Sequence, residues 1–95
     1  MTTPKRLEFS HNSVADMAAI KQYIAADNPI AAEQVVTYII ATADSLSAFP
    51  LLGRMGRKAG TRELVVPQYP YLLVYRLTAS KVTILTVAHQ SRKHR

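Results

Sequence analysis

A cluster of glycines divides this 95-residue chain into two halves with different hydrophobic patterns. Its three glycines, Gly53, Gly56 and Gly60, all fall within one short stretch. Before them, apolar residues recur every three or four positions, which is the spacing of amphipathic helices. After them, apolar residues form the alternating or continuous runs typical of β-strands. The chain is therefore expected to fold as an α+β domain with its helices before most of its sheet.

Two start signals predict helices in the first half. Ser13, followed three positions later by Asp16, resembles a capping box and predicts a helix over about residues 13–26. Asn28 before Pro29 predicts a second start, because Asn accepts a hydrogen bond from a helix amide and proline fits the first turn. The short connection between the two helices predicts an antiparallel hairpin.

Each predicted helix carries one apolar face for packing. The faces consist of Val14, Met17, Ile20 and Ile24 in the first helix and of Ala32, Val35, Val36, Ile39, Ala43 and Leu46 in the second. The second helix ends before Pro50, because the residue preceding a proline disfavours the helical conformation. The hairpin thus spans about residues 13–48.

Four segments have the patterns of strands. They are residues 5–9, 62–66, 71–77 and 81–89. Residues 71–75 are apolar on both faces, which predicts a central strand. The expected topology is β-α-α-β-β-β, with an antiparallel C-terminal meander and the helical hairpin packed on one face of the sheet.

The length of the chain predicts a single domain over residues 1–95. Besides the hairpin it comprises a basic, flexible loop at about 51–60, the C-terminal sheet at about 61–89 and a basic tail at 90–95. The chain has no cysteine, which excludes disulfides and thiolate metal sites. No apolar run approaches the roughly 18–20 residues that span a bilayer, so we expect a cytoplasmic protein without a membrane partner.

The net charge of +6 is divided unevenly along the chain. Residues 1–52 carry three basic and five acidic side chains, whereas residues 53–95 carry nine basic side chains and one acid, Glu63. Such an asymmetry predicts an anionic partner for the C-terminal half, either a nucleic acid or an acidic protein segment.

The sequence offers little for metal or cofactor chemistry. The histidines His11, His89 and His94 lack the spacing of metal ligands, and no nearby carboxylate completes a site. The chain also lacks a P-loop, a dinucleotide-binding glycine fingerprint and a serine-esterase elbow. We therefore expect neither metal nor cofactor.

One group of residues is compatible with RNA cleavage without a metal. That reaction requires an acid, a base and cations for the phosphate, which His89 with Arg62, Arg76 and Arg92 would supply. The alternative is structural, with Arg62 pairing with a helix carboxylate to brace the sheet and Arg76 covering apolar surface. We favour the structural role for Arg62 and leave both roles open for His89.

The five tyrosines are expected to pack in the core or at an interface rather than to stack on bases. They are Tyr23, Tyr38, Tyr69, Tyr71 and Tyr75. The tail at 90–95 either contacts phosphates or is a solvated charged end.

Several motifs together resemble a known family. They are Asp16-x3-Ile20-x2-Tyr23-Ile24, Asn28-Pro29-x-Ala31-Ala32, Leu46-x3-Pro50-x2-Gly53-Arg54, Gly60-Thr61-Arg62-Glu63-Leu64, Tyr71-x3-Tyr75-Arg76 and Val87-x-His89-x2-Arg92. Their order and spacing are similar to those of the ParE/RelE superfamily of toxins, over nearly the whole chain. That superfamily has the same β-α-α-β-β-β plan.

The resemblance implies the toxin of a type II toxin–antitoxin module, which stabilises a plasmid or chromosome. Its partner would be a cognate antitoxin, in a toxin–antitoxin hetero-oligomer. An acidic antitoxin segment, disordered when free, would lie across the basic half and fold on binding. The candidate contacts with this antitoxin, or with nucleic acid, are Arg54, Arg57, Lys58 and Arg62.

The superfamily contains two activities. RelE-type toxins are mRNA interferases that cleave mRNA in the ribosome, whereas ParE-type toxins inhibit DNA gyrase by binding it. RelE-like toxins commonly have an Arg where this central strand has Leu72, and the ending from Val87 to Arg92 is more similar to the ParE type. We therefore favour a gyrase-binding toxin, whose target contacts would be Arg92, Lys93 and Arg95. The alternatives are the ribosome-dependent endonuclease and a non-toxic binding module.

Overall fold

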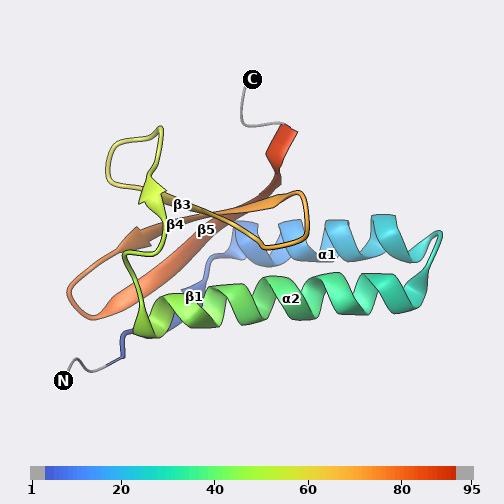
Figure 1. Ribbon diagram of the computed structural model, residues 1–95, viewed down its shortest axis with the longest axis horizontal. Helices are drawn as coiled ribbons and strands as arrows, with labels where there is room; N and C mark the ends of the chain where they lie inside the picture. The colour runs from blue at the N-terminus through green and yellow to red at the C-terminus, as the bar shows by residue number, and fades with distance from the viewer. Residues whose placement is uncertain (1–3, 92–95) are drawn as a thin grey trace.

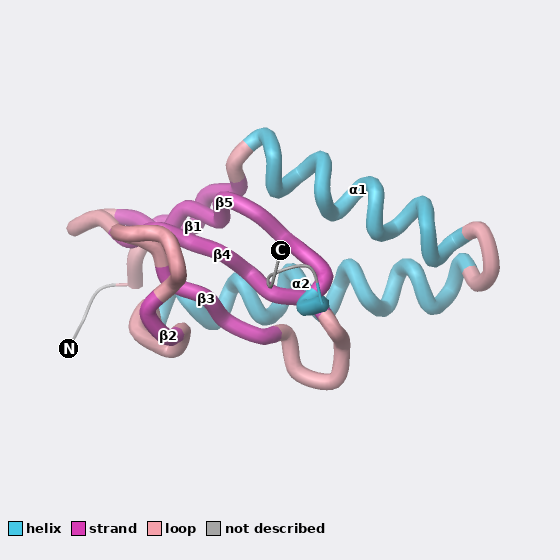
Figure 2. Tube along the Cα trace, turned by 90° about the horizontal axis from the view of Figure 1, so that it is seen from above, coloured by secondary structure: helices cyan, strands magenta, loops and turns pink. Residues whose placement is uncertain are grey.

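The computed structural model describes residues 4–91, in which two helices pack on a five-stranded sheet (Figure 1). In chain order the elements are β1 (Arg6–Phe9), α1 (His11–Ala25), α2 (Pro29–Ala48), β2 (Arg54–Met55), β3 (Arg62–Val65), β4 (Tyr71–Leu77) and β5 (Lys81–His89). The strands lie side by side in the order β1-β5-β4-β3-β2 (Figure 2). β1 runs parallel to β5, and every other pair is antiparallel. The predicted α+β fold class and the C-terminal meander are confirmed.

Helix α1 begins earlier than the sequence predicts. Its N-cap is Ser10, whose hydroxyl oxygen accepts a hydrogen bond from the Ser13 amide at 3.0 Å. Ser13 is buried, and its hydroxyl donates to the Ser10 carbonyl at 2.8 Å. Asp16 does not cap the helix, because its carboxylate accepts from the amide of Val87 in β5. The predicted capping box is therefore wrong by one helical turn.

Helix α2 has the predicted bounds. Asn28 caps it by accepting from the Ala31 amide at 3.0 Å, and Pro29 occupies the first turn. The predicted apolar face is buried at all of its positions except Val36, which is half-buried. In α1 the predicted face is partly buried against the core, but Val14 is exposed because Ser13 takes the buried position of the first turn. Within residues 4–91, no helix is both long and apolar enough to cross a membrane.

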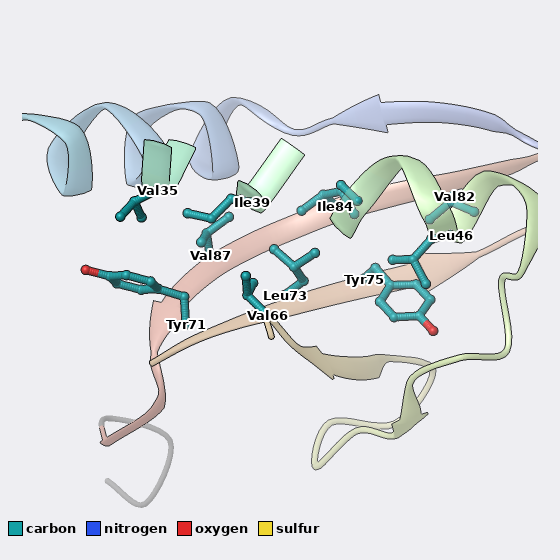
Figure 3. Close-up of a cluster of buried hydrophobic side chains, with 11 residues drawn as sticks. Val35, Ile39, Leu46, Val66, Tyr71, Leu73, Tyr75, Val82, Ile84 and Val87 are labelled. Atoms are coloured by element: carbon teal, nitrogen blue, oxygen red, sulfur yellow. The ribbon is translucent and has the colours of Figure 1, made fainter. Parts of the chain in front are cut away.

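The core lies between α2 and the two central strands (Figure 3). It contains Val35, Ile39 and Leu46 from α2, Leu73 and Tyr75 from β4, and Val82, Ile84 and Val87 from β5. Burying such a side chain stabilises the fold by about 1.5–3 kcal/mol relative to leaving it exposed. β4 occupies the middle of the sheet, and Leu72 is buried on its other face. The prediction of a central strand is therefore confirmed.

The segment after α2 contains a hydrogen-bonded turn and a short strand, within the predicted loop over residues 51–60. The Tyr75 hydroxyl donates to the Pro50 carbonyl at 2.8 Å and accepts from the Gly53 amide at 2.9 Å. The Arg62 guanidinium donates from Nε and Nη2 to the Gly53 carbonyl, at 3.1 and 2.8 Å. A Cβ at Gly53 would lie 2.6 Å from the Tyr75 hydroxyl, so only glycine fits. The chain then forms β2, a two-residue strand that the sequence pattern did not reveal.

The Tyr75→Phe substitution is predicted to destabilise the chain. It removes the acceptor of the buried Gly53 amide, and an unsatisfied buried donor costs about 1–3 kcal/mol. The measurement is urea unfolding of the purified protein, with Tyr23→Phe as the control because Tyr23 is 83% exposed. Equal stability of the two variants would show that the hydroxyl does not hold this turn.

Candidate functional site

His89 ends β5 and lies against Tyr71. The two rings meet edge to face, with centroids 5.6 Å apart and planes at 81°. The Nδ1 atom of His89 accepts from the Ser91 amide at 3.2 Å and lies 2.8 Å from the Ser91 hydroxyl oxygen. A backbone amide can only donate, so the neutral imidazole carries its proton on Nε2. This contact occupies the one basic nitrogen of the neutral ring.

A β-bulge decides which way His89 points. Ile84 is buried on the helix side of the sheet, and strict alternation would turn His89 to the opposite, open face. The register between β4 and β5 shifts next to Tyr75, which leaves Leu85 as an extra residue in β5. The shift reverses the alternation beyond it. His89 consequently pairs with Tyr71 on the helix side.

The groove beside His89 runs between α1 and β5 and has a volume of about 750 Å³. Its walls include Asp16 and Tyr23 from α1 together with Tyr71. The Asp16 carboxylate is engaged in structure, because it accepts from the Val87 amide at 2.9 Å where β1 no longer covers the edge of β5. None of the described residues lining the groove is Lys or Arg.

The structure does not bring Arg62 and Arg76 to His89. Arg62 lies opposite Tyr75, and its guanidinium binds the Gly53 carbonyl rather than a helix carboxylate. Arg76 is exposed on the open face, opposite Thr83 and at the other end of the β4–β5 ladder from His89. The fourth residue of the predicted cluster, Arg92, lies outside the described residues. Two further predicted target contacts, Lys93 and Arg95, lie outside them as well.

The predicted basic contacts in the loop gather around Glu63. This carboxylate is buried and lies 3.4 Å from Nη2 of Arg54. It also accepts from the backbone amide of Arg57 at 3.3 Å. A shallow pocket of about 350 Å³ on the open face is lined by Arg57 and Lys58 next to Glu63. The loop thus presents a basic surface fixed by one buried acid.

Sequence reasoning missed an exposed apolar surface at the start of this loop. Four large side chains contribute to it, and we call them the apolar patch: Phe49, Leu51, Leu52 and Met55. The signal in the sequence was an apolar run around Pro50 without helical or strand periodicity. Within residues 4–91 no group of three or more His, Cys, Asp or Glu residues could hold a metal ion.

Comparison with known proteins supplies a family. A family model described as "ParE toxin of type II toxin-antitoxin system, parDE" matches residues 7–94. The protein named "Putative toxin Y4kP" from Sinorhizobium fredii is 40% identical over 85 residues, which cover 90% of this chain and 88% of that protein. "Toxin RelE2" from Caulobacter vibrioides is 36% identical over 80 residues, which cover 84% of this chain and 89% of that protein.

Solved structures share the fold. A chain of the chromosomal ParDE TA system from P. aeruginosa superposes with a TM-score of 0.82 at 23% identity, covering 93% of this chain and 98% of that one. A chain of the toxin–antitoxin complex RelBE2 from Mycobacterium tuberculosis superposes with a TM-score of 0.67 at 24% identity. The superposition covers 90% of this chain and 98% of that one. At these identities the likeness shows the fold alone.

The stability of the chain is predicted to fall at alkaline pH through Tyr71. Burial raises the pKa of Tyr71 above its ordinary value of 10.0, and the nearby Tyr23 adds to the increase. Above pH 10.0 the folded chain therefore holds a proton that the unfolded chain releases, so the free energy of unfolding decreases as pH rises. Urea unfolding on either side of this pH should show a smaller decrease for Tyr71→Phe than for the unchanged chain. An equal decrease in both would contradict the prediction.

Proposed function

Because the chain belongs to the ParE/RelE superfamily of toxins of type II toxin–antitoxin systems, we propose that it is a ParE-like toxin. It stops growth by binding DNA gyrase, and a cognate antitoxin neutralises it. The observation that carries this choice is the separation of His89 from Arg62 and Arg76 on the sheet. Such a toxin requires a contact surface and no assembled catalytic site.

The separation matters because metal-free RNA cleavage depends on close geometry. A general acid or base must reach the proton it transfers at about 2.6–3.2 Å, and the cations must meet the charge that develops on the phosphate. In this chain Arg62 is held on the Gly53 carbonyl, and Arg76 lies on the other face from His89. This arrangement supports binding over cleavage.

The proposed antitoxin partner is supported by charge and by the related structures. Both structural neighbours come from toxin–antitoxin systems. Residues 53–95 of this chain carry nine basic side chains and one acid, and that acid, Glu63, is buried. An acidic antitoxin segment therefore fits this half of the domain, and its binding would stabilise the folded toxin by mass action.

One observation favours the alternative function, that of a RelE-like, ribosome-dependent and metal-independent mRNA endonuclease. His89 borders an open groove, where it would act as the acid or base. This alternative predicts cleavage of ribosome-bound message in the presence of a chelator. Intact message at a toxic concentration would remove it.

The order in which DNA and protein synthesis fail distinguishes the two targets. The chain is induced without its antitoxin, and incorporation of labelled thymidine and labelled methionine is followed together. We expect thymidine incorporation to fall first, because gyrase poisoning blocks replication. If methionine incorporation falls first, translation is the target and the gyrase proposal fails.

The His89→Ala variant is predicted to retain most of the toxicity. His89 is exposed at the end of β5, where its ring meets Tyr71 and its Nδ1 atom lies beside the Ser91 hydroxyl, so we expect its loss to leave the contact surface intact. Growth arrest after induction is the readout, with circular dichroism and expression level showing that the variant is folded and present. A folded His89→Ala protein that no longer arrests growth would favour the endonuclease.

A further inference from the structure

The apolar patch concentrates exposed hydrophobic side chains in one short segment of the chain. Its members Phe49, Leu51, Leu52 and Met55 are 64%, 68%, 54% and 71% exposed, and they follow one another within residues 49–55. Single exposed apolar side chains are ordinary, whereas larger exposed apolar surfaces mark interaction sites, and the concentration of four such residues in one short segment favours the second case. Residues 49–55 join the end of α2 to β2, at the margin of the sheet (Figure 1).

This surface is preformed. The hydroxyl of the buried Tyr75 bonds to both ends of the turn from Pro50 to Gly53, and Arg62 binds the Gly53 carbonyl from β3. The Leu52 amide also donates to the Phe49 carbonyl at 3.1 Å. A surface held by these contacts loses little conformational entropy when a partner binds.

Next to the patch the sheet ends in an unpaired strand edge. Within residues 4–91, β2 is the last strand of the sheet and pairs only with β3 (Figure 2). The Gly56 amide donates to the Thr61 carbonyl at 2.8 Å, so these two residues form a hydrogen-bonded pair of the antiparallel ladder. Such pairs alternate with pairs whose backbone groups point outward. The N–H and C=O of Met55, opposite Arg62, therefore point away from β3 and are available to another strand.

The two faces of this edge differ in chemistry. Met55, the member of the apolar patch that belongs to β2, lies on the helix side opposite Arg62, and its sulfur accepts from Nη1 of Arg62 at 3.3 Å. Arg54 lies on the open face, where it meets Glu63 next to the basic residues Arg57 and Lys58. Because side chains of neighbouring strands share faces, a strand added beside β2 would place alternate residues against apolar and basic surface.

We propose that the β2 edge is a docking site for an extended partner segment in which apolar and acidic residues alternate. The segment adds as a sixth strand: its backbone pairs with Met55, its apolar side chains cover the apolar patch and its carboxylates face Arg54 and Lys58. The inference rests on the proposed function only in assigning this segment to the antitoxin. A second copy of this chain fits less well, because pairing two β2 edges brings like charges together.

The first test uses peptides and the full chain. One peptide alternates Glu with Val, and its control has the same composition with the Glu and Val residues in two separate blocks. Fluorescence anisotropy is expected to show about tenfold tighter binding of the alternating peptide, because only that peptide matches both faces of the edge. Equal affinities would overturn the proposal. So would displacement of the alternating peptide by a single-stranded RNA that binds more tightly.

Variants of the chain distinguish binding by strand addition from non-specific binding to an apolar surface. Met55→Pro removes an N–H that makes no bond to β3, so it should weaken binding about tenfold, while Met55→Leu keeps both the amide and the apolar side chain. Leu51→Asp should weaken binding as well. Its matched control is Ile30→Asp, because Ile30 is 72% exposed at the start of α2 and should have no effect. Unchanged binding of a folded Met55→Pro protein would refute strand addition.

If the Met55→Pro variant does not fold, amide hydrogen exchange of the unchanged chain tests strand addition instead. In the unchanged chain the Met55 amide should exchange rapidly alone and become protected with the alternating peptide. Absence of protection at saturating peptide would refute the docking site. If the alternating peptide binds but induction of the chain does not arrest growth, the docking site stands and the toxin proposal fails. If induction arrests growth but the peptide does not bind, the toxin proposal stands and the docking site fails.

Discussion

The Tyr75 hydroxyl links the core of this domain to its surface. The ring is fully buried between Leu46 and the central strands, while the hydroxyl reaches the chain that leaves α2 (Figure 3). Its two bonds, to Pro50 and Gly53, fix where that chain turns back toward the sheet. The position of β2 follows from this turn, and with it the apolar patch, the free strand edge and the basic loop around Glu63.

Much of the fold could be predicted from the sequence because its signals are local. The bounds of α2, β4 and β5 follow from an Asn-Pro cap, a proline stop and continuous apolar runs. The start of α1 could not be predicted in the same way. Ser10 caps that helix while its hydroxyl also donates to the Leu85 carbonyl of β5, a partner distant in sequence. Strand β2 likewise has only two residues and depends on Tyr75 and Arg62 rather than on a pattern of its own.

The candidate site could not be predicted from residue types alone, because its geometry depends on the pairing register between β4 and β5. Alternation along β4 correctly places Arg76 with Leu72 and Val74 on the open face. Alternation along β5 would place His89 on that face too, had Leu85 not entered the strand as an extra residue. A bulge leaves no signal in a run of apolar and hydroxyl residues, and it reverses every side chain beyond it. The sequence therefore named candidate residues but could not show that the fold separates Arg62 and Arg76 from His89.

Four polar side chains of the described domain hold backbone groups in place. Asp16 binds the Val87 amide, Glu63 binds the Arg57 amide, Arg62 binds the Gly53 carbonyl and Tyr75 bridges Pro50 and Gly53. Over residues 4–91, every buried side-chain nitrogen and oxygen has a hydrogen-bond partner. Catalytic sites often keep polar groups desolvated and aimed at a substrate instead. The proposed toxin, which acts by contact, would instead use side chains that this domain leaves exposed, such as Leu51, Arg54 and Lys58.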